Sequence, residues 1–212
     1  MMASLILGIS GKKRSGKDTF AARLIDQHGF TRIAFADPLK RTMEDLDPIV
    51  EIQPDELGTV YGPGVLGTVV YGVAHARLTT ILKAIGWEKA KEIREVRRLL
   101  QAHGVAIREH LAEDAWVDAA MAQADNVDGP VVITDVRFPN EADSVSYSGR
   151  GFLVRVTRPG VESTDAHVSE TAMDDVGAYF EVTNGGTVAD LQAQADEVFA
   201  TLQADYWYLL EN

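Results

Sequence analysis

A glycine-rich, basic run near the N-terminus has the residue types and spacing of an anion-binding loop. Residues 11–19 read Gly-Lys-Lys-Arg-Ser-Gly-Lys-Asp-Thr, and they follow the apolar run 5–9 and precede a helical pattern. Glycines let successive backbone N–H groups turn toward one set of oxygens, and the helix that follows adds the positive end of its dipole. Lys17 can then reach the β- and γ-phosphates of a nucleoside triphosphate. The residues predicted to bind phosphate are Gly11, Lys13, Arg14, Ser15, Gly16, Lys17, Asp18 and Thr19.

The same motif has an unusual ending that bears on magnesium. Asp18 stands where a Ser or Thr normally offers its hydroxyl to the metal, and Thr19 comes one residue later. Either side chain could serve the metal shell, Asp18 through water. An acidic residue at the end of a neighbouring strand usually completes such a site, and Asp135 ends the apolar run 131–135. We predict magnesium at Asp18, Thr19 and Asp135. Val136 follows Asp135 in place of a water-activating glutamate, which favours transfer to a bound acceptor over hydrolysis.

Short apolar runs alternate with helical patterns along the chain, as in βαβ units with a mainly parallel sheet. Five strands are expected, at residues 5–9, 32–36, 131–135, 152–157 and 179–182. A helix is expected over 88–103 with Gly104 as its stop, and another over 188–202 after a capping box of Thr187 and Asp190. The pattern predicts an α/β fold of the three-layer P-loop NTPase type.

The length and composition favour one domain. The chain has 212 residues, of which 46% are hydrophobic, enough to bury one substantial core. We therefore expect a single domain over 1–212. Residues 46–76 show no sustained period and are expected to form an irregular insertion, while the polar stretch 158–178 is expected to act as a lid.

The charge balance excludes several classes of partner. The net charge of −12 argues against a broad nucleic-acid surface, because such binding relies on many lysines and arginines. No apolar run approaches the ~20 residues of a membrane span. The absence of cysteine excludes disulfides and fits a reducing cytoplasm. A second basic group, Arg94, Arg97, Arg98 and Arg108, could be a solvated helix face paired with neighbouring glutamates or a site for an anion.

Several motifs in order along the chain resemble a known family. They are residues 8–19, the run Phe-Ala-Asp-Pro-Leu-Lys at 35–40, Leu99-Leu100-Gln101 with Gly104, Arg108 and Trp116, the run 134–141, and Ser169-Glu170. Together they resemble the deoxynucleoside monophosphate kinases of bacteriophages. The resemblance implies a nucleoside-monophosphate-kinase-like fold, Mg-ATP as donor and a deoxynucleoside monophosphate as acceptor. A cytoplasmic location is expected, in the host cell if the protein is phage-encoded, and a homodimer is left open.

Phosphoryl transfer depends on aligning two anionic ligands and neutralising the charge between them. We assign Lys17 to the donor phosphates, and Arg137 and Arg108 to the transferred group or the acceptor phosphate. The residues that the resemblance or their place at the sheet edge puts at the acceptor are Asp37, Lys40, Gln101, Arg108, Trp116, Arg137, Arg158, Ser169 and Glu170. Asn184 is expected beside the adenine.

Structural alternatives accompany these roles. Asp37 with Pro38 could simply start a helix, and Trp116 could be a core residue. Arg137 could pair with Glu141, while Asn184 could belong to a tight turn. Two other activities also fit the loop: a small-molecule kinase resembling the phosphomevalonate kinases of animals, and a P-loop ATPase or nucleotide switch.

Overall fold

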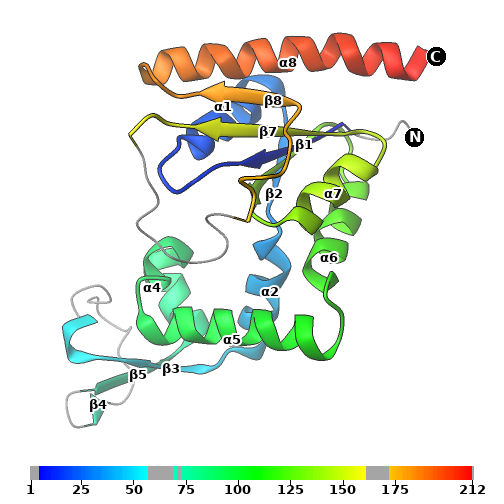
Figure 1. The fold of residues 1–212 in the computed structure, drawn as a ribbon. Coiled ribbons are helices and arrows are strands. Elements are labelled where there is room, and N and C mark those ends of the chain that lie inside the picture. The colour runs from blue at the N-terminus through cyan, green and yellow to red at the C-terminus, as the bar shows by residue number, and fades with distance from the viewer. Residues whose placement is uncertain (1–4, 57–68, 71–72, 161–171, 212) are drawn as a thin grey trace. The chain divides into compact units, whose positions relative to one another are not determined.

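The computed structural model describes residues 5–56, 69–70, 73–160 and 172–211. The chain divides into two compact units, Met1–Ala36 with Trp116–Asn212 and Asp37–Ala115, and the described residues of each form its elements. Figure 1 labels the elements of both units, and we describe each unit by itself. None of the helices in the described part of the chain combines the length and apolar character that crossing a bilayer would require.

The first unit is built on a five-stranded sheet in the order β2-β6-β1-β7-β8. The strands are β1 (Ile6–Ser10), β2 (Thr31–Ile33), β6 (Val131–Val136), β7 (Gly151–Thr157) and β8 (Phe180–Thr183). Every neighbouring pair is parallel. The predicted α/β fold with a mainly parallel five-stranded sheet is confirmed. β2 is shorter than expected, because the chain leaves the strand after Ile33 and α2 begins at Ala36.

Helices cover both faces of this sheet (Figure 1). They are α1 (Lys17–His28), α6 (Ala115–Asp125), α7 (Pro139–Tyr147) and α8 (Val188–Glu211). Alternate residues of β1 serve the two faces: Leu7 and Ile9 pack in one cluster with α1 and α8, and Ile6 packs in the other with α6 and α7. All of β1 is buried, as expected for the central strand of a covered parallel sheet. The result is a three-layer core.

The start of α8 has the capping box that the sequence predicts. The Thr187 hydroxyl accepts a hydrogen bond from the Asp190 amide (3.2 Å), and the Asp190 carboxylate accepts one from the Thr187 amide (2.7 Å). The helix then runs well beyond the expected end at 202, to Glu211.

An ion-pair cluster joins α8 to α1. Arg23 donates two hydrogen bonds to the Asp196 carboxylate (2.9 and 2.8 Å), and His28 Nε2 lies 2.7 Å from the same group. The His28 ring also lies against Phe199, with centroids 4.1 Å apart. Hydrogen bonds from Arg23 and then His28 hold the pKa of Asp196 well below its ordinary value. The cluster therefore depends on an ionised carboxylate.

Acid is expected to loosen this contact. A carboxyl group whose pKa is lowered by folding stabilises the native state above its unfolded pKa, near ~3.9, and this contribution is lost as pH falls through the folded value. Asp196→Asn should lower the melting temperature by a few degrees at pH 7 and less at pH 3. Thermal unfolding across pH 3–7 measures this, with the exposed Asp26→Asn on α1 as control. Equal losses at both pH values would contradict the assignment.

The second unit contains a three-stranded antiparallel sheet and helices. Its elements are α2 (Ala36–Leu46), β3 (Ile49–Ile52), a 3₁₀ turn (Pro54–Glu56), β4 (Val69–Val70), β5 (Val73–Arg77), α4 (Leu78–Ala90) and α5 (Arg94–His110). The strands lie in the order β3-β5-β4. The described part of 46–76 is thus not irregular as expected. Its strands are two to five residues long, too short to show a period in the sequence.

The helix expected over 88–103 is also corrected. Residues 88–90 end α4, and α5 begins only at Arg94 and continues through Gly104 to His110. Gly104 is therefore no stop signal. A Cβ there would lie at an ordinary contact distance, 3.4 Å, from the Leu39 side chain, so α5 passes close to α2 at this position. The Glu56 carboxylate caps the start of α5 by accepting from the Arg94 amide (2.8 Å).

Candidate functional site

The turn between β1 and α1 contains two glycines whose backbone angles and close contacts other residues rarely accommodate. Gly11 has φ of +151°, and a Cβ at this position would lie 2.4 Å from the carbonyl oxygen of Val156 on β7. Gly16 has φ of +101°, and its Cβ would lie 2.4 Å from Asn184 Nδ2. Both positions exclude a side chain, so the loop can run close to neighbouring strands and to a ligand.

Asn184 was expected beside the adenine. In the structure its side chain contacts the backbone of the loop between β1 and α1. Its side-chain amide donates to the Ser15 carbonyl (2.9 Å), and its backbone amide donates to the Thr157 carbonyl (2.8 Å). The residue therefore ties the end of β8 to the loop. Its backbone amide thus bonds the neighbouring strand β7, and its side chain shapes the loop.

Ser15 carries an observation that points to a ligand. Its side chain is 1% exposed, and its hydroxyl has no hydrogen-bond partner among the described residues. Buried polar atoms almost always have a partner, so this hydroxyl fits an oxygen of a bound group. Lys17 begins α1, whose first amides have no intrahelical acceptor. A bound phosphate would accept hydrogen bonds from both the Ser15 hydroxyl and these helix amides. This supports the prediction that the loop binds phosphate.

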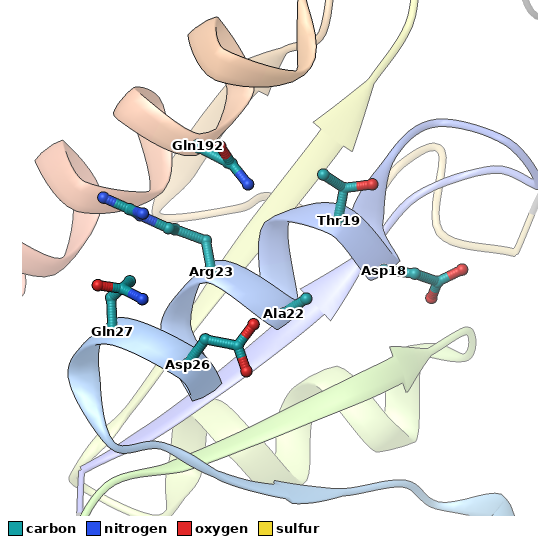
Figure 2. Close-up of a pocket in the computed structure, with 7 residues that line it drawn as sticks. All are labelled: Asp18, Thr19, Ala22, Arg23, Asp26, Gln27 and Gln192. Atoms are coloured by element: carbon teal, nitrogen blue, oxygen red, sulfur yellow. The ribbon is translucent and has the colours of Figure 1, made fainter.

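The other predicted loop residues are more open. Lys13, Arg14 and Asp18 are exposed, and Arg14 has φ of +67°. Figure 2 shows Asp18 and Thr19 in a shallow hollow along α1, with Arg23 and Asp26 of that helix and Gln192 of α8. Thr19 projects on the side of α1 nearer to α8, and Asp18 projects away from it (Figure 2).

A separate pocket of about 360 Å³ lies at the carboxyl ends of the three central strands. Its lining residues are Ser10, Gly11, Lys12, Ser15, Val136, Arg137, Arg155, Val156, Thr157, Arg158, Met173 and Asp174. From β1 the chain passes to β2 on one side of the sheet, and from β7 it passes to β8 on the other side. Ligands of open α/β sheets bind at such a switch point, outside the carboxyl ends of the strands. We therefore take this pocket, and not the hollow along α1, as the candidate site.

The pocket is strongly cationic. Its described lining includes Lys12 and three arginines, of which Lys12 lies 3.6 Å from the Asp174 carboxylate and Arg155 pairs with Glu181. The structure thus brings the predicted residues Arg137 and Arg158 together with Gly11 and Ser15 of the loop. Such a pocket suits a ligand that carries several negative charges.

The end of β6 is held by a buried carboxylate. Glu141 is 5% exposed, and its Oε2 accepts hydrogen bonds from the backbone amides of Arg137 (2.7 Å) and Phe138 (3.1 Å). Glu141 therefore caps the start of α7. Its link to Arg137, the structural alternative considered above, includes a main-chain contact that fixes where the arginine leaves the strand.

Asp135 also makes main-chain contacts. Its carboxylate accepts from the amides of Phe35 (2.7 Å) and Ala36 (3.1 Å), at the corner that follows β2. The described residues contain no group of three or more acidic or His side chains placed to hold a metal alone. Magnesium in kinase sites is bound through one or two carboxylates, waters and substrate phosphates. Asp135 could supply one such carboxylate.

The acceptor residues predicted in the second unit lie on α2 and α5. The Lys40 ammonium lies 3.7 Å from the Asp37 carboxylate, and Gln101 and Arg108 are exposed on α5. Trp116, in the first unit, is only 7% exposed, as its core alternative requires. Ser169 and Glu170 lie outside the described residues.

The pocket residues that the sequence prediction did not assign include Arg155, Met173 and Asp174. Arg155 left a signal, because a charged residue in the apolar run 152–157 requires partners if it faces the interior. Met173 and Asp174 gave none, since they stand in a polar segment without a period.

A parallel α/β sheet that carries a glycine-constrained loop and a cationic pocket at its carboxyl edge defines an α/β protein suited to phosphate groups. The family model of deoxynucleotide monophosphate kinases matches residues 70–195. A protein of Acanthamoeba polyphaga mimivirus, described as "Putative deoxynucleotide monophosphate kinase", is 30% identical over 199 residues, covering 90% of this chain and 93% of the viral protein. The chain belongs to the deoxynucleotide monophosphate kinase family, a family of nucleotide kinases.

Solved structures show a likeness of fold. The crystal structure of TT1252 from Thermus thermophilus has a TM-score of 0.50 at 19% identity, covering 94% of this chain and 98% of that one. Dephospho-CoA kinase from Campylobacter jejuni has a TM-score of 0.39 at 16% identity, covering 92% and 95%. The first supports the fold alone, and the second is too distant to carry an argument.

Proposed function

We propose that the protein transfers the γ-phosphoryl group of Mg-ATP to a deoxynucleoside monophosphate, giving a deoxynucleoside diphosphate and ADP. The observation that carries this proposal is the pocket at the ends of β1, β6 and β7. It combines the loop, whose Ser15 hydroxyl has no partner in the described part of the chain, with Arg137 and Arg158, which directly follow β6 and β7. Membership of the family makes a nucleotide the expected ligand.

The donor is assigned to the loop. Its triphosphate would receive hydrogen bonds from the loop amides and the Ser15 hydroxyl, and the charge of Lys17 at the start of α1. Asp135, with Asp18 or Thr19, would bind magnesium and its waters. Magnesium, when bound, neutralises the phosphates and orients them for transfer.

The acceptor is assigned to the arginine side of the pocket. An oxygen of its phosphate forms a bond to the γ-phosphorus while the bond from that phosphorus to the bridging oxygen of ADP breaks. Arg137 and Arg158 would offset the charge that two anionic ligands bring together. This requires the two ligands to approach the transferred group from opposite sides, because attacking and leaving oxygens are roughly in line.

We also assign to the acceptor the residues of the second unit that the family resemblance singled out. α2 and α5 pack together through Leu39 and Gly104, and the Thr42 hydroxyl lies 3.0 Å from His103 Nε2. Asp37 and Lys40 of α2, and Gln101 and Arg108 of α5, are the side chains proposed to read the base and bind the phosphate.

A panel of acceptors tests the reaction. Purified protein with Mg-ATP should form ADP at a rate that depends on an added monophosphate, when dTMP, dGMP, dCMP, phosphomevalonate and no acceptor are compared. Turnover of phosphomevalonate alone would show the other small-molecule kinase. Equal ADP release without an acceptor would show an ATPase instead, and either result would overturn the proposal.

A further inference from the structure

Arg155 holds a segment of chain that lies far from it in sequence. Its guanidinium donates to the carbonyl of Met173 (2.7 Å) and to that of Val176, and it pairs with the Glu181 carboxylate (3.3 Å). The side chain is 20% exposed, so these contacts replace most of its water. A planar guanidinium can bridge several acceptors in this way, whereas the single ammonium of a lysine cannot hold the same geometry.

The segment that Arg155 holds forms one wall of the candidate site. Met173 is 8% exposed and packs in the core cluster of β6, α6 and α7. Asp174 follows it in the pocket lining and pairs with Lys12 of the loop. Arg155 therefore connects β7 to Met173, and the next residue, Asp174, contacts the loop through Lys12. We call Met173 and Asp174 the wall of the site.

The wall lies where the acceptor is expected. Met173 and Arg137 both line the pocket, and Met173 packs with the strand β6 from which Arg137 leaves. The donor phosphates, by contrast, are assigned to the loop at the end of β1. In-line transfer places the acceptor across the γ-phosphate from the leaving ADP, and we assign it to the side of Arg137 and Met173.

We propose that Arg155 is a positioning residue that holds Met173 and Asp174 as the wall of the acceptor site. This inference rests on the proposed kinase activity. Since a displacement of about 1 Å can cost about 100-fold in rate, losing the bridge should affect transfer far more than it affects donor binding. The guanidinium of Arg155 already contacts the two carbonyls and Glu181. Its role therefore depends on the shape of the guanidinium as well as on its charge.

The test compares Arg155→Gln and Arg155→Lys with a matched control, Arg150→Gln. Arg150 directly precedes the first residue of the same strand and pairs with Asp125. Both variants of Arg155 should raise the acceptor KM and lower kcat, so that kcat/KM for the monophosphate falls by about 10- to 100-fold, with the KM for ATP changed less than about twofold. The control should retain the wild-type values.

A second measurement does not need turnover. The Val176 amide donates to the Met173 carbonyl (3.2 Å), and its hydrogen exchange should be faster in Arg155→Gln than in the wild type and in the control. A fully active Arg155→Lys would overturn the inference, because charge alone would then suffice. A fall in melting temperature with unchanged KM and kcat would also overturn it, since the role would be structural only.

Failure of the proposed function would look different. Wild-type protein would then phosphorylate no deoxynucleoside monophosphate. The hydrogen-exchange measurement would still show whether Arg155 holds Met173 and Asp174 in place. Unchanged protection of the Val176 amide in Arg155→Gln would overturn the inference in that case as well.

Discussion

Lys17→Ala is expected to lower kcat for phosphoryl transfer by about 10²–10³-fold, the effect of removing one preorganised group that stabilises the transition state. Lys17 is the first residue of α1, directly after the constrained Gly16, so its position relative to the loop is fixed by the backbone. Transfer brings negative charge onto the oxygens around the γ-phosphorus, and the lysine offsets it there. Steady-state rates with saturating ATP and acceptor measure the loss.

The control for this variant removes a lysine elsewhere. Lys91 pairs with Glu88 at 2.8 Å on an exposed surface of the second unit, and Lys91→Ala should leave kcat within about twofold of the wild type because exposed pairs contribute little. Retention of full activity by Lys17→Ala would remove the donor role assigned to the loop.

Arg137→Ala is expected to lower kcat/KM for the acceptor by about 10²–10³-fold, with a smaller effect on the KM for ATP. The arginine lines the pocket beside the loop, where the acceptor phosphate and the transferred group would meet. The Glu141 contact to the backbone amide of residue 137 survives the substitution, so α7 keeps this cap. Kinetics with the acceptor varied at saturating ATP provide the measurement.

Arg137→Lys separates charge from geometry at the same position. A lysine keeps the charge but cannot bind a phosphate with two parallel hydrogen bonds, so activity between those of Ala and wild type is expected. If Arg137→Ala changed only the melting temperature, Arg137 would be a structural partner of the α7 cap and not a ligand of the acceptor.

The features that the sequence predicted well are local ones. The loop from Gly11 to Lys17 depends on glycines, a strand before it and a helix after it, all within a short stretch of chain. The Thr187–Asp190 cap involves residues three positions apart, and its hydrogen bonds form as predicted. The central strands could be found because a parallel sheet covered on both faces requires continuous apolar runs.

The incorrect predictions concern residues whose environment comes from distant parts of the chain. Gly104 has the residue type of a helix stop, yet it lies inside α5, where it faces Leu39 of another helix. Strands β3 and β5 are too short to show a period, and pairing with each other makes them strands. In both places tertiary packing overrides a weak local preference.

The sequence by itself predicted a phosphate-binding loop and the α/β class, and it singled out Arg137 and Arg158 as candidate cations. Only the tertiary structure decided that these arginines share a pocket with Ser15, that Asn184 supports the loop, and that Arg155 holds the Met173–Asp174 wall. Arg155 and Met173 are 18 positions apart in the chain, and Asn184 and Ser15 are 169 apart. Contacts over such separations leave no periodic pattern, because they arise from strand order and packing and not from the local backbone.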